Sequence, residues 1–225
     1  MIFMNPIKRI IPFVISLLIL PVISFAAPEQ DPIIIQHQKL NAKRLQPNAV
    51  PNSTGQWTRI EIPLFAKENP DDKANNKKWI RNVDVDLTLI YKDQNAKGAN
   101  DFIVLRSKAR LFALEINKKI PVVFYIPSEA YDIYRLSAEP FAWKIEISIE
   151  GTPIELNKDN MKTMLSKNIF KGNNPRANYE RFMKLVETAA KANEGVLMPL
   201  PDCPYNVKFF EYSKPQPIPN YLPTK

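Results

Sequence analysis

Two neighbouring segments, residues 83–91 and 102–116, constrain the fold of this chain more than any other feature. In the first, an apolar residue occupies every second position from Val83 to Tyr91, and most positions between them are polar. Such alternation is typical of a β-strand that turns one face to a core. If the second segment pairs antiparallel with the first so that opposed residue numbers sum to 194, apolar residues meet on the inner face: Leu89 with Leu105, Val85 with Ala109 and Val83 with Leu111.

The same register also matches charges on the outer face. It opposes Asp86 to Lys108 and Asp84 to Arg110, and a shift of one residue would lose the apolar and the charged pairs together. The sequence therefore predicts a hairpin closed by roughly residues 92–101. The two aspartates could instead hold a divalent cation, but salt bridges explain them, and no local motif supplies the about six to eight oxygens of a calcium site.

Other segments predict further strands and a few helices. Strands are expected at residues 57–65, 120–126, 141–149 and 205–212, and Pro63 favours a sheet edge for the first. Helices are expected at residues 128–136 and 160–167, and from Asn174-Pro175, a cap residue with a first-turn proline, to Gly195. Six or seven antiparallel strands with late helices predict a mainly β fold, an antiparallel β-sandwich with inserted and C-terminal helices over residues 57–212.

The first 26 residues have the organisation of a signal peptide. Lys8 and Arg9 form a basic region, residues 10–23 are apolar, and Ser24-Phe25-Ala26 is a small-x-small cleavage site. An uncleaved membrane anchor is the alternative, but this apolar run is shorter than the roughly 20 residues that cross a bilayer. We expect an exported protein, periplasmic or extracellular, with no integral membrane segment after cleavage.

The composition narrows the activities open to the exported chain. Without Lys8 and Arg9, 29 basic residues face 23 acidic ones, and the net charge of +6 is spread along the chain. Nucleic-acid binding is therefore not expected, since it needs basic residues clustered on one face. Five glycines leave few phosphate-binding turns. Cys203, the only cysteine, cannot form an intrachain disulfide and is expected to be a partly buried, unreactive thiol.

Proline-rich segments flank the predicted domain. Residues 27–56 predict a flexible linker, although residues 33–35 could add a strand to a sheet. Residues 213–225 contain four prolines and predict an extended tail. Because pre-extended segments bind at low entropic cost, this end supplies candidate partner-binding residues: Tyr212, Pro215, Pro217, Pro219 and Tyr221. A basic stripe is a further candidate, although internal ion pairs are the safer explanation: Arg106, Lys108 and Arg110.

No group of residues indicates a catalytic centre, a metal site or a cofactor site. His37, the only histidine, lies in the predicted linker and is expected to be an incidental surface residue. Asp71 and Asp72, near Glu68, predict a solvated turn because three lysines follow them. A carboxylate pair could still act as in glycosidases, but nothing singles out an acid and its partner. We expect a protein that is not an enzyme and has no cofactor.

Three short motifs lie between residues 120 and 156: Phe124-Tyr125-Ile126-Pro127, Glu139-Pro140-Phe141-Ala142-Trp143 and Ile149-Glu150-Gly151. In these motifs the chain resembles secreted immunoglobulin-like proteins encoded beside bacterial type IV pilus genes. The resemblance implies an immunoglobulin-like β-sandwich, in the periplasm or at the cell surface, that assists assembly. It transfers no catalytic residue. The Cys…Trp…Cys pattern of antibody domains is absent, because Cys203 stands alone.

Three functions remain open from the sequence. The first is a non-enzymatic accessory or adaptor module that binds other envelope proteins through sheet edges and flexible ends, with a link to pilus assembly implied by the resemblance. The second is a carbohydrate- or peptidoglycan-binding module, which would need an exposed aromatic residue such as Trp57 or Trp79. The third is a small secreted hydrolase, which would need a cleft with two carboxylates within reach of each other.

Overall fold

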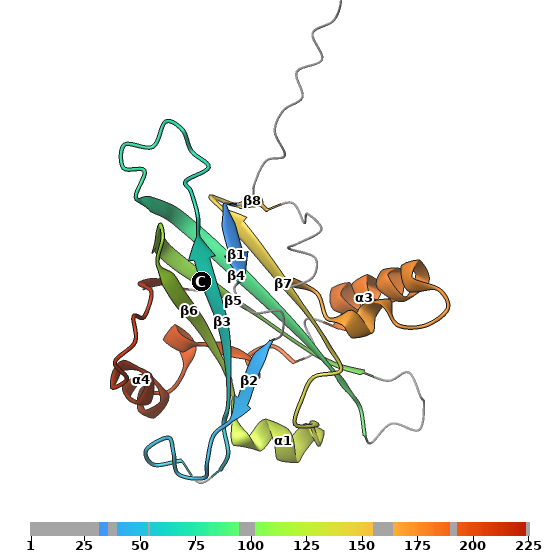
Figure 1. The fold of residues 1–225 in the computed structure, drawn as a ribbon. Coiled ribbons are helices and arrows are strands. Elements are labelled where there is room, and N and C mark those ends of the chain that lie inside the picture. The colour runs from blue at the N-terminus through green and yellow to red at the C-terminus, as the bar shows by residue number, and fades with distance from the viewer. Residues whose placement is uncertain are drawn as a thin grey trace, which may run out of the picture. The chain divides into compact units, whose positions relative to one another are not determined.

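The computed structural model describes residues 32–35, 40–53, 55–94, 102–154, 164–189 and 193–223. Within these ranges, two antiparallel β-sheets pack face to face, with helices at their margins (Figure 1). The predicted signal peptide, His37 and residues 160–163 of the helix expected at residues 160–167 lie outside the described residues. No described helix is both long and apolar enough to span a membrane.

The first sheet has the strand order β1-β3-β6-β9, and β2 pairs with β3 on the same side as β1. Its strands are β1 (Ile33–Ile35), β2 (Asn41–Arg44), β3 (Thr58–Ala66), β6 (Lys119–Ile126) and β9 (Met198–Pro199). The second sheet has the order β10-β5-β4-β7-β8. Its strands are β4 (Trp79–Lys92), β5 (Phe102–Glu115), β7 (Ala142–Ile149), β8 (Thr152–Pro153) and β10 (Tyr221–Leu222).

Apolar side chains from both sheets form one core between them. Alternate residues of β3, β4 and β6 contribute most of it, among them Ile60, Ile62, Leu64, Val83, Val85, Leu87, Leu89, Val122 and Phe124. The chain path agrees in part with an immunoglobulin-like sandwich, because β3 and β6 share the first sheet and β4, β7 and β8 share the second. β5 departs from the seven-stranded pattern, since it pairs with β4 in the second sheet. The predicted mainly β sandwich is confirmed.

The predicted hairpin register is confirmed. β4 and β5 oppose Leu89 to Leu105 and Val83 to Leu111, so opposed numbers sum to 194 along the ladder. The ion pairs are confirmed only in part. Asp84 lies near Arg110, as expected, but Lys108 also lies near Asp84 and not near Asp86, and Asp86 binds the diagonal neighbour Arg106. The planar guanidinium of Arg106 makes two parallel hydrogen bonds to the Asp86 carboxylate, a fork geometry that a lysine ammonium does not have.

Pro63 does not mark a sheet edge in the way predicted, because β3 has neighbours on both sides. It lies opposite Pro121 of β6. On its other side, β1 pairs with residues 64–66 and β2 with residues 58–61, so Pro63 falls at the break between the two short strands. A proline, which has no backbone N–H to donate, fits a position where no partner strand is needed.

The segment 27–56 differs from the flexible linker expected there, although residues 33–35 do add a strand to a sheet, as the sequence allowed. In its described part, β1 and β2 pair with β3, and Leu45 and Val50 are buried. The Leu45 N–H also donates to the carbonyl of Trp57 at 2.8 Å. The physical reason is the free edge of β3, whose unpaired backbone groups favour strand pairing even by a short, proline-flanked segment.

Two helices begin where the sequence predicts them. α1 (Ser128–Tyr134) follows Pro127. α3 (Pro175–Ala189) starts with its proline in the first turn, and the side chain of Asn174 accepts a hydrogen bond from the N–H of Ala177 at 3.1 Å. The buried side of α3 packs on the end of the second sheet through Phe182 and Val186.

The strand expected at residues 205–212 is wrong, because this segment forms α4 (Tyr205–Tyr212). Its inward residues are Val207 and Glu211, both fully buried. A strand would place Phe209 on the same face as these two residues, but Phe209 is 53% exposed, as the helical period requires. A short aromatic-rich run fits the helical period and the strand period equally well. The sequence pattern did not reveal the helical period, because the inward residue Glu211 is charged and is normally assigned to the surface.

Candidate functional site on the C-terminal segment

The C-terminal segment crosses the outer side of the first sheet and continues to the edge of the second. α4 follows the short 3₁₀ turn η2 (Leu200–Asp202) and begins after Pro204. Its inner side joins a small apolar cluster separate from the main core, made by Leu45, Val50, Trp57, Val123, Tyr125, Leu200, Cys203 and Val207. This cluster holds α4 against β6.

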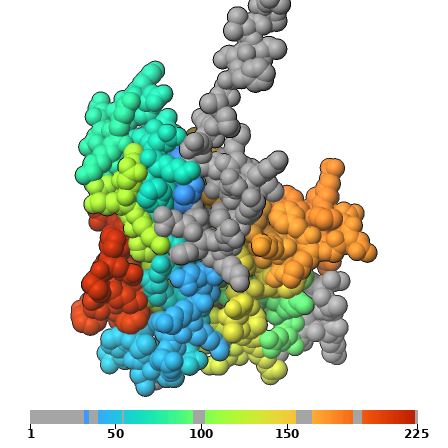
Figure 2. All heavy atoms as spheres, in the orientation of Figure 1, coloured from blue at the N-terminus to red at the C-terminus, as the bar shows by residue number. Residues whose placement is uncertain are grey.

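The outer side of α4 presents three aromatic side chains to solvent. Tyr205, Phe209 and Tyr212 are 81%, 53% and 59% exposed. Their spacing of four and three residues puts them on one helical face, and the rings of Tyr205 and Phe209 stack with centroids 6.3 Å apart. We call these three residues the aromatic stripe. Figure 2 shows α4 at the molecular surface, in red.

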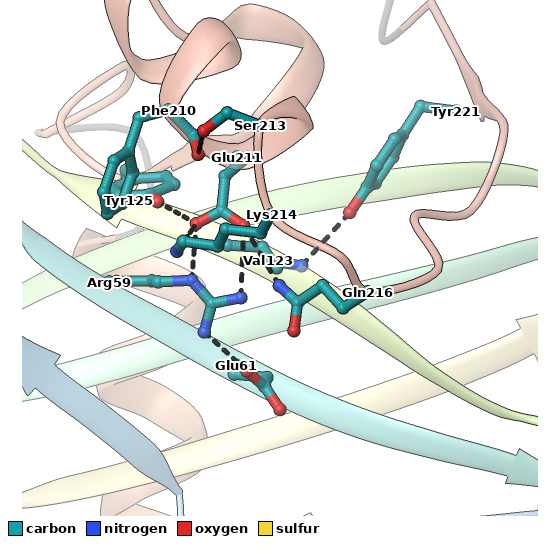
Figure 3. A network of polar contacts seen from close by, with 10 residues as sticks. All are labelled: Arg59, Glu61, Val123, Tyr125, Phe210, Glu211, Ser213, Lys214, Gln216 and Tyr221. Atoms are coloured by element: carbon teal, nitrogen blue, oxygen red, sulfur yellow. Dashed lines mark hydrogen bonds and ion pairs between the residues drawn. The ribbon is translucent and has the colours of Figure 1, made fainter. Parts of the chain in front are cut away.

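Glu211 fastens α4 to the sheet from the inner side (Figure 3). Its side chain is fully buried, and its carboxylate accepts hydrogen bonds from Arg59 Nε at 2.5 Å and Nη2 at 3.2 Å. The hydroxyl of Tyr125 and the ammonium of Lys214, at 2.9 Å, also donate to it, and so does the amide of Gln216 at 3.3 Å. A buried carboxylate with this many donors has its hydrogen-bonding capacity met.

The network is close to neutral, because two cations, Arg59 and Lys214, meet two carboxylates, Glu61 and Glu211. Burial alone would raise the pKa of Glu211, but the hydrogen bonds from Arg59, Tyr125 and Lys214 outweigh it and lower that pKa. Burial, followed by the contact with Glu211, raises the pKa of Tyr125. Glu211 is therefore held ionised and Tyr125 protonated. This arrangement is suited to holding α4 in place, not to exchanging protons with a substrate.

The tail beyond α4 differs from the extended, exposed segment expected at residues 213–225. Tyr221 and Leu222 form β10 at the edge of β5, and the carbonyl of Asn220 accepts from Phe112 N–H at 2.8 Å. The hydroxyl of Tyr221 accepts from the backbone N–H of Val123 in β6 at 3.1 Å (Figure 3). One tyrosine thus connects the edges of both sheets, because each edge offers backbone groups that need partners.

The predicted partner-binding residues divide into two groups. Tyr212, Pro215 and Pro217 are exposed, whereas Pro219 is buried and Tyr221 is half-buried in the bridge just described. The sequence did not indicate Glu211, Arg59, Tyr205 or Phe209. The helical spacing of the exposed aromatics after Pro204 was the signal that could have identified three of the surface positions.

The basic stripe is engaged within the protein. Arg106 makes two hydrogen bonds to Asp86, at 2.9 and 2.7 Å, whereas Lys108 and Arg110 lie 3.7 and 3.3 Å from Asp84. The three basic side chains thus already pair with Asp84 and Asp86, so their positive charges are largely neutralised within the protein. Asp84 and Asp86 are used in the same pairs, and among the described residues no three His, Cys, Asp or Glu side chains gather closely enough to hold a metal ion.

Cys203 is buried beside Pro199, with its sulfur 3.5 Å from that residue's carbonyl oxygen. Burial raises the pKa of its thiol to about 12. Because the thiolate is the reactive form, this cysteine acts as a small apolar residue of the cluster under α4.

Neither a protein-family model nor a curated protein sequence matches this chain. A crystal structure of a protein from Akkermansia muciniphila is similar in fold, with a TM-score of 0.59 over 88% of this chain and 97% of that chain. The two sequences are 12% identical. At that identity the similarity shows a shared fold, an antiparallel β-sandwich with helices at its margins.

Proposed function

We propose that this protein is an exported, non-enzymatic accessory module of the bacterial cell envelope, and that it binds another envelope protein through the aromatic stripe of α4. The observation that carries the proposal is the placement of Tyr205, Phe209 and Tyr212 on the outside of a helix whose inside is fixed by Glu211. The signal peptide expected at residues 1–26 supports export. The resemblance to proteins encoded with pilus genes supports a role in assembly.

The chemistry of the stripe favours a protein partner. Aromatic residues are enriched in the cores of protein interfaces, and Tyr is among the residues that most often dominate binding energy. Exposed apolar groups gathered on one face also differ from the scattered single residues of an ordinary surface. Tyr212 extends the stripe to the exposed prolines at 215 and 217, which widens the available contact surface.

A rigid support makes this surface effective. The Glu211 network and the apolar cluster under α4 fix the helix before any partner arrives. Binding then costs little ordering of the backbone, and more of the contact energy appears as affinity.

Site-specific photo-crosslinking in native envelopes tests this function. A photoreactive phenylalanine analogue replaces Tyr205, Phe209 or Tyr212 in the full chain, and Ile133 of α1, which is 68% exposed, serves as the matched control. We expect all three stripe positions to capture the same exported protein and position 133 not to capture it. The Tyr205→Ala/Phe209→Ala variant should lose that protein in co-purification while Ile133→Ala retains it. Capture of unrelated proteins at each position, or retention by the double variant, would contradict the proposal.

A further inference from the structure

A groove at one end of the second sheet combines aromatic and polar walls. It lies where β4 begins and β5 and β7 end, beside the loop of residues 67–78 that joins β3 to β4 (teal in Figure 1). Its volume is about 510 Å³, within the range of about 300–1,000 Å³ found for pockets that hold small ligands. We call it the Trp79 groove.

Two aromatic side chains line the groove. Trp79 is 38% exposed and Phe112 is 54% exposed, although most large apolar residues of this sheet are buried. The face of an aromatic ring carries partial negative charge. The C–H groups on one side of a sugar ring are apolar and slightly positive, so they can pack against such a face. An aromatic wall beside a polar wall thus suits a sugar, which has an apolar C–H face and polar hydroxyl groups.

The aromatic wall is held in place by the loop. The side-chain amide of Asn69 donates to the carbonyl of Trp79 at 2.8 Å, and the N–H of Trp79 donates to the carbonyl of Asn76 at 3.4 Å. Asn69 also accepts from the N–H of Asp71 at 3.0 Å, which fixes the loop itself. The groove is therefore formed before a ligand binds, which lowers the entropic cost of binding.

The polar wall offers donors and acceptors in nearly balanced charge. Asn75 and Asn220 contribute amides, whereas Arg81 and Glu150 face each other at 3.8 Å with both side chains largely exposed. A hydroxyl group donates and accepts at once, and amide, guanidinium and carboxylate groups supply both functions. With Asp71 also in the lining, the groove has no excess positive charge to attract phosphates or acidic polymers.

We propose that the Trp79 groove binds a short neutral saccharide, with one sugar ring stacked on Trp79 or Phe112 and its hydroxyls bonded to Arg81, Glu150 and the amide side chains. This inference does not depend on the adaptor function, because the groove and the aromatic stripe share no residue. A module with both sites would hold a protein partner through α4 and an envelope glycan through the groove.

Tryptophan fluorescence of the full mature chain tests the proposal directly. Of the three tryptophans, Trp79 is exposed, whereas Trp57 is buried and Trp143 is half-buried, so a sugar stacked on Trp79 dominates any change in emission. The probes are chitotetraose, cellotetraose and maltotetraose. We expect at least one to shift the emission with a dissociation constant at or below about 1 mM.

Variants measured by calorimetry separate the groove from other surfaces. Trp79→Ala and Phe112→Ala should each weaken binding at least about tenfold, and Phe209→Ala, which removes an exposed aromatic side chain from α4, should leave it unchanged. If Trp79→Ala unfolds, Asn75→Ala on the exposed loop replaces it. No response to any probe at about 10 mM, or binding that survives both groove variants, overturns the proposal.

Discussion

Arg59 on β3 and Glu211 on α4 are joined by two hydrogen bonds between guanidinium and carboxylate, although 152 residues separate them in sequence. Such a fork-to-fork pair fixes orientation as well as distance. β3 lies in the interior of the first sheet. The pair therefore fixes α4, and with it the aromatic stripe, relative to the first sheet.

Replacing Glu211 should destabilise the protein more than replacing its neighbour Glu61. Glu211→Gln leaves the Arg59 charge, whose side chain is 11% exposed, with only one carboxylate, and a broken buried pair costs about 3 kcal/mol. Glu61→Gln removes the more exposed partner and should cost about 1 kcal/mol or less. Urea unfolding of both variants measures the difference. Equal free energies of unfolding would show that Glu211 is not the anchor of this network.

The same carboxylate should make stability depend on acid pH. The pKa of Glu211 in the folded protein lies below its ordinary value of 4.5, so the unfolded chain binds the proton more readily. The stabilisation is then complete above pH 4.5 and is lost as the pH falls through the lowered value in the folded protein. The difference in unfolding free energy between the wild type and Glu211→Gln should be constant from pH 6 to 8 and should shrink below pH 4.5. A difference that stays constant into acid would contradict this linkage.

The hairpin of β4 and β5 could be predicted from the sequence because two independent signals agree. The period-two alternation fixes the faces, and the charges at Asp84 and Arg110 fix the register. α3 was predictable for a similar reason, since Asn174-Pro175 is a local start signal beside an apolar face. In each case the information lies within a few residues or between adjacent strands.

α4 and the pairing of β2 could not be predicted in this way, whereas the sequence indicated the added strand at residues 33–35 but not that β3 is its partner. The buried side of α4 contains Glu211, a residue type that a sequence pattern assigns to solvent, and its partner Arg59 lies in a distant strand. The short strands before residue 56 depend on the free edge of β3. Both features are created by tertiary structure, and local sequence carries little trace of them.

The diagonal pair between Asp86 and Arg106 should contribute more than the diagonal pair between Asp84 and Lys108. Asp86 is 9% exposed and accepts two hydrogen bonds from Arg106, so Asp86→Asn should lose about 1.5 kcal/mol. Lys108 lies 3.7 Å from Asp84 and is about half exposed, and Lys108→Gln should change stability by less than about 0.5 kcal/mol. Urea unfolding at low and at 1 M salt tests both values. A larger loss for Lys108→Gln would mean that the ion pair between Lys108 and Asp84 contributes more than the two-bond pair between Arg106 and Asp86.

Cys203 should resist alkylation in the folded protein. Its thiol has a pKa of about 12 and is buried beneath α4, so almost no thiolate is present or accessible at pH 8. Incubation with iodoacetamide followed by mass spectrometry should show no modification of the native chain and full modification in urea. Rapid labelling of the native protein would show that α4 detaches from the sheet frequently.

Tyr221 should stabilise the fold, in contrast to a tail that serves only as a spacer. Its hydroxyl accepts from Val123 N–H, and its backbone pairs with Leu111 of β5. Tyr221→Phe leaves that N–H without its partner and should cost about 1–2 kcal/mol, equivalent to a fall in melting temperature of about 2–8 °C for a domain of this size. Pro217→Ala, at an exposed position of the same segment, should shift the melting temperature by no more than about 2 °C. Deletion of residues 219–225 removes both contacts of Tyr221 and should lower the melting temperature more than Tyr221→Phe does. A truncated chain as stable as the full one would refute this role.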